Sequence, residues 1–391
     1  MTENMNDEER LVNTNSQESE FLTGNMTKTF WKYAVMAACG ILGSCIAVII
    51  DGFFMGNAVG AEALAAISVC LTLMYFAMGY CAMMGVGAST LAGIKLGEGD
   101  EEGARDIYGA ILIFALISAI IISALALIFL NPLLRLLGAT DTVLPYARDY
   151  AVLFWCLFPL SVLGQVGYYF CRLAEKPRAA LIAFIAASVG AVVFEYIVVF
   201  ILKLGVVGSA VSFVVGIAGT VFLLPYLQGA KNIFKLAKKN LKLNMHYVWD
   251  SIKIGFPMFL FNLCPLITTV IINNELIAYG GSDLHLSAFA IFNAYIVYVM
   301  NALTSGFTAG IQPIASTNMG AKAYGRVRKL IKTGVFQSFI VLLIIQILVM
   351  FFARPVVSFF AGGVEELVDL TVKAMRINIA LFAFGNVATL V

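Results

Sequence analysis

Apolar residues occur in long runs that are separated by short polar connections along almost the whole chain. A run of about 18 apolar residues is long enough to cross the hydrocarbon core of a bilayer as a helix. The pattern predicts ten such helices, near residues 31–56, 63–93, 107–130, 147–172, 179–202, 206–228, 251–279, 285–312, 330–353 and 369–391. We therefore expect an all-α membrane protein.

Composition agrees with this expectation. Hydrophobic residues make up 61% of the chain and charged residues 12%, and the mean hydropathy is +0.92. A soluble globule would expose too much apolar surface at this composition. The seven cysteines lie in or beside apolar runs without a CxxC pair or a histidine cluster, so we interpret them as small apolar packing residues rather than as disulfides or metal ligands.

Two polar stretches divide the chain. Residues 1–28 are polar and acidic and lack the features of a signal peptide, which predicts a flexible cytoplasmic tail. Residues 229–250 combine lysines with apolar residues, which predicts an amphipathic helix on the cytoplasmic membrane surface. Between and after them we expect an amino-terminal lobe of six helices, 29–228, and a carboxyl-terminal lobe of four, 251–391.

Basic residues are distributed unevenly between the two sides of the membrane. If the amino terminus is cytoplasmic, 19 of the 25 Lys and Arg residues lie on the cytoplasmic side and 6 on the other. Because cytoplasmic loops carry an excess of Lys and Arg, this distribution predicts that orientation.

The two lobes are predicted to be copies of each other. The run that begins at Gly85 aligns with the run that begins at Ser305 at an offset of 223, which pairs Gly87 with Gly310 and Pro132 with Pro355. Since the first copy contains an even number of spans, the second has the same orientation, so the repeats are parallel and a cavity is expected between the lobes. By this offset the second copy lacks two spans, and the repeat predicts a full length of about 450 residues.

Asp51 is the one acid in the first apolar run. An ionisable group within a membrane helix is costly, by about 2.5–3.5 kcal/mol on insertion scales, and usually faces a bundle interior or an aqueous path. We therefore expect Asp51 to bind a coupling cation. The alternative is that it caps a helix end near the outer surface.

Several segments resemble the MATE (multidrug and toxic compound extrusion) family of cation-coupled exporters. They are IIDGFFMGNAVGAEALAAIS, LGEGDEEGAR, CRLAEKPRAALIA, FEYIVVFILKLGVVGSA and AGIQPIASTNMGAKAYGRVRK, and the resemblance extends from about Trp31 to the carboxyl terminus. It implies that Asp51 and an acid in the fifth span bind the cation. The family pattern there is N-x-x-x-D, whereas this chain has Ala191 and Glu195, which suits a proton better than a metal ion. The alternative for Glu195 is an interhelical hydrogen bond that only packs the lobe.

Further polar residues lie within the predicted spans. Asn273, Asn274 and Glu275 are expected about opposite Asp51 in the second copy, and Gln165 and Gln312 are candidates for lining the substrate or cation path. Helix packing is the alternative for each of them.

The sequence therefore predicts a secondary antiporter of the bacterial or archaeal cytoplasmic membrane that exports amphipathic organic compounds. Its coupling ion is H⁺ or Na⁺, and we expect no organic cofactor, no bound metal, no nucleic-acid partner and a monomer in contact with lipids. The alternatives are a flippase for lipid-linked saccharides and a membrane-embedded enzyme. An enzyme would need a cluster of histidines or acids at membrane depth, but the two histidines, His246 and His285, lie in loops or at a span end.

Overall fold

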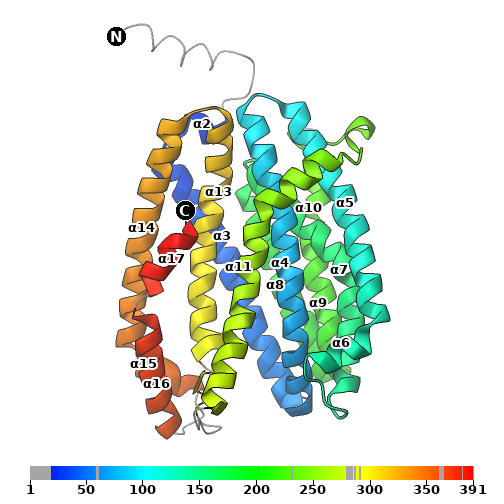
Figure 1. Ribbon diagram of the computed structural model, residues 1–391, viewed down its shortest axis with the longest axis vertical. Helices are drawn as coiled ribbons and strands as arrows, with labels where there is room; N and C mark the ends of the chain where they lie inside the picture. Colours follow the sequence, from blue (N-terminus) through cyan, green and yellow to red (C-terminus); the bar gives the residue numbers. More distant parts are fainter. Residues whose placement is uncertain are drawn as a thin grey trace.

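The computed structural model describes residues 19–58, 61–203, 205–229, 232–278, 285, 288–289, 292–360, 365–380 and 382–390. Over these residues the secondary structure is helical, without a strand, and the long helices lie side by side in one bundle (Figure 1). We call the end at which α2 lies the amino-terminal end and the opposite end the far end.

The first lobe contains the helices that precede residue 228. They are α2 (Glu20–Thr23), α3 (Met26–Ala58), α4 (Ala61–Gly97), α5 (Glu101–Ile128), α6 (Leu130–Leu136), α7 (Leu144–Leu173), α8 (Pro177–Tyr196), the π-helix η1 (Ile197–Ile201), α9 (Gly205–Val221) and α10 (Leu223–Leu227).

The second lobe follows a short connection. Its elements are the 3₁₀ turn η2 (Lys238–Asn240), α11 (Met245–Ala278), the π-helix η3 (Phe292–Val297), α13 (Tyr298–Gly320), α14 (Tyr324–Phe351), α15 (Ala353–Phe360), α16 (Glu365–Ile379) and α17 (Phe382–Leu390).

Six of the described helical stretches are long and apolar enough to cross a membrane. They are Met26–Asp51, Leu73–Gly97, Glu101–Ile128, Leu144–Leu173, Pro177–Ile201 and Tyr324–Phe351. The other four expected spans overlap α9, α11, α13 and the pair α16 and α17. The chain is thus an all-α membrane protein, as the apolar pattern predicts.

The contacts between the lobes repeat with two-fold symmetry. A Cβ added to Gly87 of α4 would overlap Ser251 of α11, and a Cβ added to Gly310 of α13 would overlap Ala34 of α3. The two contacts are related by the repeat. Gly310 of α13 is the counterpart of Gly87 of α4, 223 residues later, and Ser251 of α11 is the counterpart of Ala34 of α3, 217 residues later. Because α3 and α11 both run from the amino-terminal end to the far end (Figure 1), the two-fold axis lies along the helices and the repeats are parallel.

Small residues let the lobes approach closely at the amino-terminal end. Gly97 lies against the backbone of Thr317, and its counterpart Gly320 lies against the backbone of Ile94. Any larger side chain at these positions would push the backbones apart, as at other small-residue helix contacts in membranes. The structure is therefore closed between the lobes at this end.

Two expectations about the polar stretches differ from the structure where it describes them; residues 1–18 of the expected tail lie outside the described residues. Residues 19–28, expected in a flexible tail, form α2 and the first turn of α3, and Phe21 is 2% exposed. Residues 229–250 form no amphipathic surface helix in their described part, which contains only the turn η2 before α11 begins at Met245.

Tertiary contacts explain why the described part of residues 229–250 forms no surface helix. Phe234 is fully buried between the rings of Tyr108 and Phe170, and the Asn240 amide donates hydrogen bonds to Glu102 and Asp106 of α5. These contacts hold the connection against the first lobe. They stabilise it more than its amphipathic pattern would stabilise a helix on the membrane surface.

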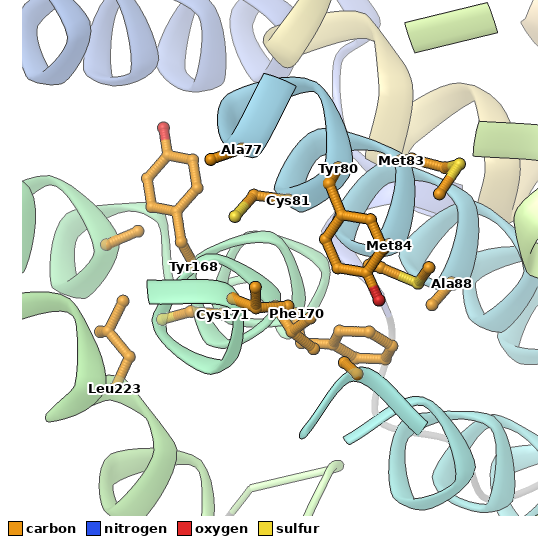
Figure 2. Packing of buried hydrophobic residues seen from close by; sticks show 14 of the residues in the cluster. Ala77, Tyr80, Cys81, Met83, Met84, Ala88, Tyr168, Phe170, Cys171 and Leu223 are labelled. Atoms are coloured by element: carbon orange, nitrogen blue, oxygen red, sulfur yellow. The ribbon is translucent and has the colours of Figure 1, made fainter. Parts of the chain in front are cut away.

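The core of the first lobe lies between α4, α7 and α10. Figure 2 shows Cys81 and Met84 of α4 beside Phe170 and Cys171 of α7. All seven cysteines are free; Cys45, Cys70, Cys81 and Cys171 are buried, and Cys39, Cys156 and Cys264 are exposed. The buried four act as small packing residues, whereas the other three lie on exposed helix faces.

Candidate functional site

The fold brings Asp51 and Glu195 together inside the first lobe. Asp51 belongs to α3, and Glu195 lies in the last turn of α8, which begins with Pro177 as its first residue. The two carboxyl groups lie within hydrogen-bonding reach of each other. Glu195 is 2% exposed, and its Oε1 has no hydrogen-bond partner among the described residues.

Ser209 of α9 completes the polar contacts of the pair. Its hydroxyl donates a 2.6 Å hydrogen bond to Oδ1 of Asp51, and Ser209 itself is 2% exposed. The preceding residue, Gly208, lies close to Val198 and Val199 of η1. The absence of a side chain at Gly208 therefore allows α9 to come near enough for Ser209 to reach Asp51.

Aromatic rings lie beside the pair. The ring of Phe54, one turn after Asp51, lies 6.0 Å from that of Tyr196 and 5.2 Å from that of Phe200. Phe200 belongs to η1, the π-helical segment that begins two residues after Glu195. π-Helical turns are frequent at functional sites because they rotate side chains out of the regular register.

Tyr150 of α7 is a further neighbour. It is 4% exposed and lies near Asp51, Glu195 and Cys70. Side chains from α3, α7, α8 and α9 therefore surround the pair, in which Glu195 is buried and Asp51 is partly exposed.

This arrangement has a direct chemical consequence. A hydrogen bond between two carboxyl groups requires a proton on one of them, because an ionised carboxylate can only accept. Two ionised carboxylates placed side by side would repel each other, so a single shared proton favours the pair. The pair can therefore hold one proton between Asp51 and Glu195 and release it when the surroundings change.

The structure excludes the alternative that Asp51 caps a helix end. The helix α3 continues for seven residues beyond Asp51, to Ala58, which is about 10 Å of helix. Asp51 is therefore not a cap at the helix end. Ala191, where the resembling family has an amide, faces Gly216 of α9, where an added Cβ would lie 3.6 Å from the Ala191 Cβ, and it contributes no polar group to the pair.

The candidates in α11 do not lie where the sequence comparison put them. The offset of 217 between α3 and α11 places Thr268, rather than Asn273, Asn274 and Glu275, opposite Asp51. Glu275 is exposed near the end of α11, and the side chains of Asn273 and Asn274 lie outside the described part of the structure.

Neither glutamine lies at the pair. Gln312 of α13 donates hydrogen bonds of 2.9 Å to Ser89 and Thr90 of α4, and so joins the two lobes. Ser89 is the repeat counterpart of Gln312, which places this contact on the two-fold axis. Gln165 lies fifteen residues after Tyr150 on α7, about 22 Å along the helix, and its buried Oε1 has no partner among the described residues.

Ser209 and Tyr150 were missed by the sequence analysis. Ser209 stands within the quoted segment FEYIVVFILKLGVVGSA, where a serine beside a glycine in an apolar run is a usable signal. Tyr150 follows the charged residues Arg148 and Asp149 in RDYA, and nothing in that local pattern distinguishes it from an interfacial tyrosine.

Comparison with known proteins places this site in a family. The protein-family model MatE matches residues 37–197 and 254–391, which together are most of the chain. The chain belongs to the MatE family. The two matched segments begin 217 residues apart, which agrees with the offset between α3 and α11.

Other MatE proteins that resemble the chain include curated relatives and solved structures. The probable multidrug resistance protein YoeA of Bacillus subtilis is 24% identical over 346 residues, covering 85% of this chain and 73% of YoeA. The multidrug export protein MepA of Staphylococcus aureus is 22% identical over 369 residues, covering 93% of this chain and 80% of MepA. A structure of a MATE family multidrug resistance transporter in an outward-facing conformation superposes with a TM-score of 0.86 at 20% identity, covering 96% of this chain and 84% of that chain.

Proposed function

We propose that this chain is a proton-coupled antiporter that exports amphipathic organic compounds across the cytoplasmic membrane. The observation that carries the proposal is the proximity of Asp51 to the buried Glu195, with the two carboxyl groups within hydrogen-bonding reach. A pair that shares one proton favours H⁺ over Na⁺ as the coupling ion, because Ala191 supplies no oxygen ligand beside it.

Coupling follows from the position of the pair between helices. A proton on the pair permits the Asp51–Glu195 hydrogen bond, which holds α3 against α8, while Ser209 holds α9 against Asp51. Loss of the proton leaves two carboxylates that repel each other. A ligand shifts a conformational equilibrium only by its differential affinity for the two states, and this change in packing provides such a difference.

The relatives support the substrate class. YoeA and MepA are described as multidrug resistance and multidrug export proteins, so we propose varied small organic molecules as substrates here. The chain is proposed to act as a monomer among lipids with a cytoplasmic amino terminus, and without a cofactor. The proposed cycle contains no chemical step, so the exported compound leaves unmodified.

The test uses proteoliposomes that contain the full chain and ethidium, an amphipathic organic cation. An imposed pH gradient should accelerate ethidium transport by the wild type, and a Na⁺ gradient alone should not. Asp51→Asn and Glu195→Gln should each remove the acceleration while leaving membrane insertion intact. Glu366→Gln, which changes an exposed acid of α16, serves as the matched control and should transport at the wild-type rate.

Three results would overturn the proposal. The first is acceleration of the Glu195→Gln variant by the pH gradient to the wild-type rate. The second is a wild-type response to Na⁺ alone, which would assign sodium as the ion. The third is a wild type that moves no ethidium under either gradient but does translocate lipid-linked saccharides, which would favour the flippase alternative.

A further inference from the structure

Residues 19–24, which we call the amino-terminal strap, are bound to the first lobe through Glu175. Glu175 lies in the turn between α7 and α8. Its Oε1 accepts a 2.5 Å hydrogen bond from the Ser19 hydroxyl, and its Oε2 accepts a 3.2 Å hydrogen bond from the backbone N–H of Glu20. Both carboxylate oxygens of Glu175 are therefore used to hold the strap.

The strap is also bound to the second lobe. The Asn318 amide of α13 and the Arg326 guanidinium of α14 donate to the carbonyl oxygen of Phe21, at 2.9 and 3.2 Å. Arg326 donates a further bond of 3.0 Å to the carbonyl oxygen of Gly24. The strap therefore joins the two lobes at the end of the bundle where they are closed.

Glu175 occupies a backbone position that suits glycine. Its φ is +60°, in the left-handed region, and it follows the carboxyl end of α7, where the N–H of Lys176 bonds to the carbonyl of Cys171. Glycine is the usual residue at this position of such a helix end. Here the chain carries a carboxylate despite the strain, and the strap is what that carboxylate binds.

Arg172 lies one helical turn before Glu175 and is 3% exposed. None of its three guanidinium nitrogens has a hydrogen-bond partner among the described residues. The guanidinium lies 5.5 and 5.9 Å from the ring centres of Tyr168 and Tyr169. A buried charge without a hydrogen-bonded partner is costly, so a conformation that supplies an acceptor gains free energy.

Tyr33 lies between the strap and this arginine. Tyr33 lies near Arg172 and Glu175, and the ring of Phe21 in the strap lies 5.1 Å from the ring of Tyr33. Removing the strap would uncover Tyr33 and free the Glu175 carboxylate at the same time. Glu175 follows Arg172 by three residues across the end of α7, and the charges of both act on Tyr33.

We propose that Glu175 is a gating residue that exchanges partners, holding the strap when the lobes are closed at the amino-terminal end and pairing with Arg172 when they open there. This exchange rests on the alternation between two states in the proposed function, but it does not depend on which ion or substrate is transported. Because the strap contacts and the Arg172 pair compete for one carboxylate, weakening the strap favours opening and removing Arg172 favours closure.

The test measures the distance between the lobes by spin labels at Arg178→Cys and Lys329→Cys, which are exposed positions of α8 and α14. The exposed Cys39, Cys156 and Cys264 are replaced by serine in this background. Ser19→Ala should raise the ratio of long to short distances about tenfold, which corresponds to the loss of one charge-assisted hydrogen bond. Ser188→Ala, whose hydroxyl bonds only to the backbone of its own helix α8 in the contacts that the structure gives, is the control and should not change the ratio.

The second arm adds Arg172 substitutions to Ser19→Ala. Arg172→Gln should return the ratio toward the closed state about tenfold, whereas Arg172→Lys, which can still pair with Glu175, should stay open. Arg172→Leu has the same expected effect and replaces Arg172→Gln if that variant does not fold.

An unchanged ratio in Ser19→Ala, or an Arg172→Gln effect in the same direction as Ser19→Ala, would overturn the exchange. The distances are measured in detergent without substrate or gradient. Failure of the gate and failure of proton coupling are therefore distinguishable.

Discussion

At the scale of single residues, the site depends on how Asp51 is held. The Asp51 carboxylate accepts a hydrogen bond from the Ser209 hydroxyl and lies beside the carboxyl group of Glu195. A hydrogen bond to a charged group contributes about 1.5–3 kcal/mol, and the contribution is larger in a dry site. Ser209 therefore fixes the orientation of the Asp51 carboxyl group beside Glu195.

Ser209→Ala tests this role. The variant should fold with a free energy of unfolding reduced by about 1–2 kcal/mol, and its pH-gradient-driven transport should fall about tenfold because Asp51 is free to turn away from Glu195. Ser212→Ala is the matched control, since the Ser212 hydroxyl bonds to the backbone carbonyl of Ser209 in its own helix. Equal effects of the two variants on transport would contradict the role of Ser209.

The sequence predicted the two acids but not their surroundings. Asp51 and Glu195 stand out because a charge in an apolar run is rare, and the structure brings them together. Tyr150 becomes recognisable only when α7 is packed beside α3, since a polar uncharged residue in a membrane helix does not show its role by itself. Ser209 has a local signal, a serine beside a glycine in an apolar run, but its contact with Asp51 depends on the packing of α9 against α3. The placement of Asn273, Asn274 and Glu275 opposite Asp51 failed because one offset was applied to both helix pairs.

At the scale of elements, the connection between the lobes behaves as part of the first lobe. The aromatic ring of Phe234 is buried against Tyr108 and Phe170, and Arg105 donates a 2.7 Å hydrogen bond to the carbonyl of Ile233. The amphipathic pattern of this stretch predicted a surface helix, because periodicity alone does not include a specific aromatic pocket on a neighbouring lobe.

Phe234→Ala should lower the free energy of unfolding by about 3–5 kcal/mol, the usual cost of removing a buried phenylalanine. Thermal unfolding in detergent measures it. Leu241→Ala is the control, because Leu241 is 48% exposed and its truncation should cost little. A Phe234→Ala variant as stable as Leu241→Ala would show that the connection does not belong to the folded first lobe.

At the scale of the whole molecule, the repeat governs how the lobes meet. The residues of one interlobe contact reappear as counterparts in the other, and Gln312 bonds to its own counterpart Ser89. The parallel repeat was predictable because matched glycines and prolines recur at a constant offset. The close contact of the lobes at the amino-terminal end was not, because a repeat specifies two similar lobes and not the angle between them.

Gly87→Ala should disturb this closed contact. Its new methyl group would overlap the Ser251 carbonyl, so the lobes must separate, at a cost of about 1–3 kcal/mol. The interlobe spin-label distance at positions 178 and 329 should lengthen. Gly325→Ala, where a methyl group meets open space, should leave the distance unchanged; an unchanged distance in both variants would contradict the tight packing at Gly87.

The uneven distribution of basic residues maps onto the two ends of the bundle. The elements α6, α15 and α16, which carry Arg135, Arg354 and Arg376, lie at the end opposite α2 (Figure 1). We therefore predict that Arg328→Cys reacts with a membrane-impermeant maleimide only in everted vesicles and Arg135→Cys only in intact cells, both in a background without exposed native cysteines. The reverse labelling would contradict a cytoplasmic amino terminus.

The central claim is that the Asp51–Glu195 pair carries the coupling proton, and proton release on substrate binding tests it most directly. Ethidium is added to the detergent-solubilised wild type in lightly buffered solution, and the pH change is recorded. We predict release of about one proton per bound ethidium at saturation, because substrate and proton favour opposite states. Glu195→Gln should bind ethidium and release none; release by this variant at the wild-type level would contradict the account.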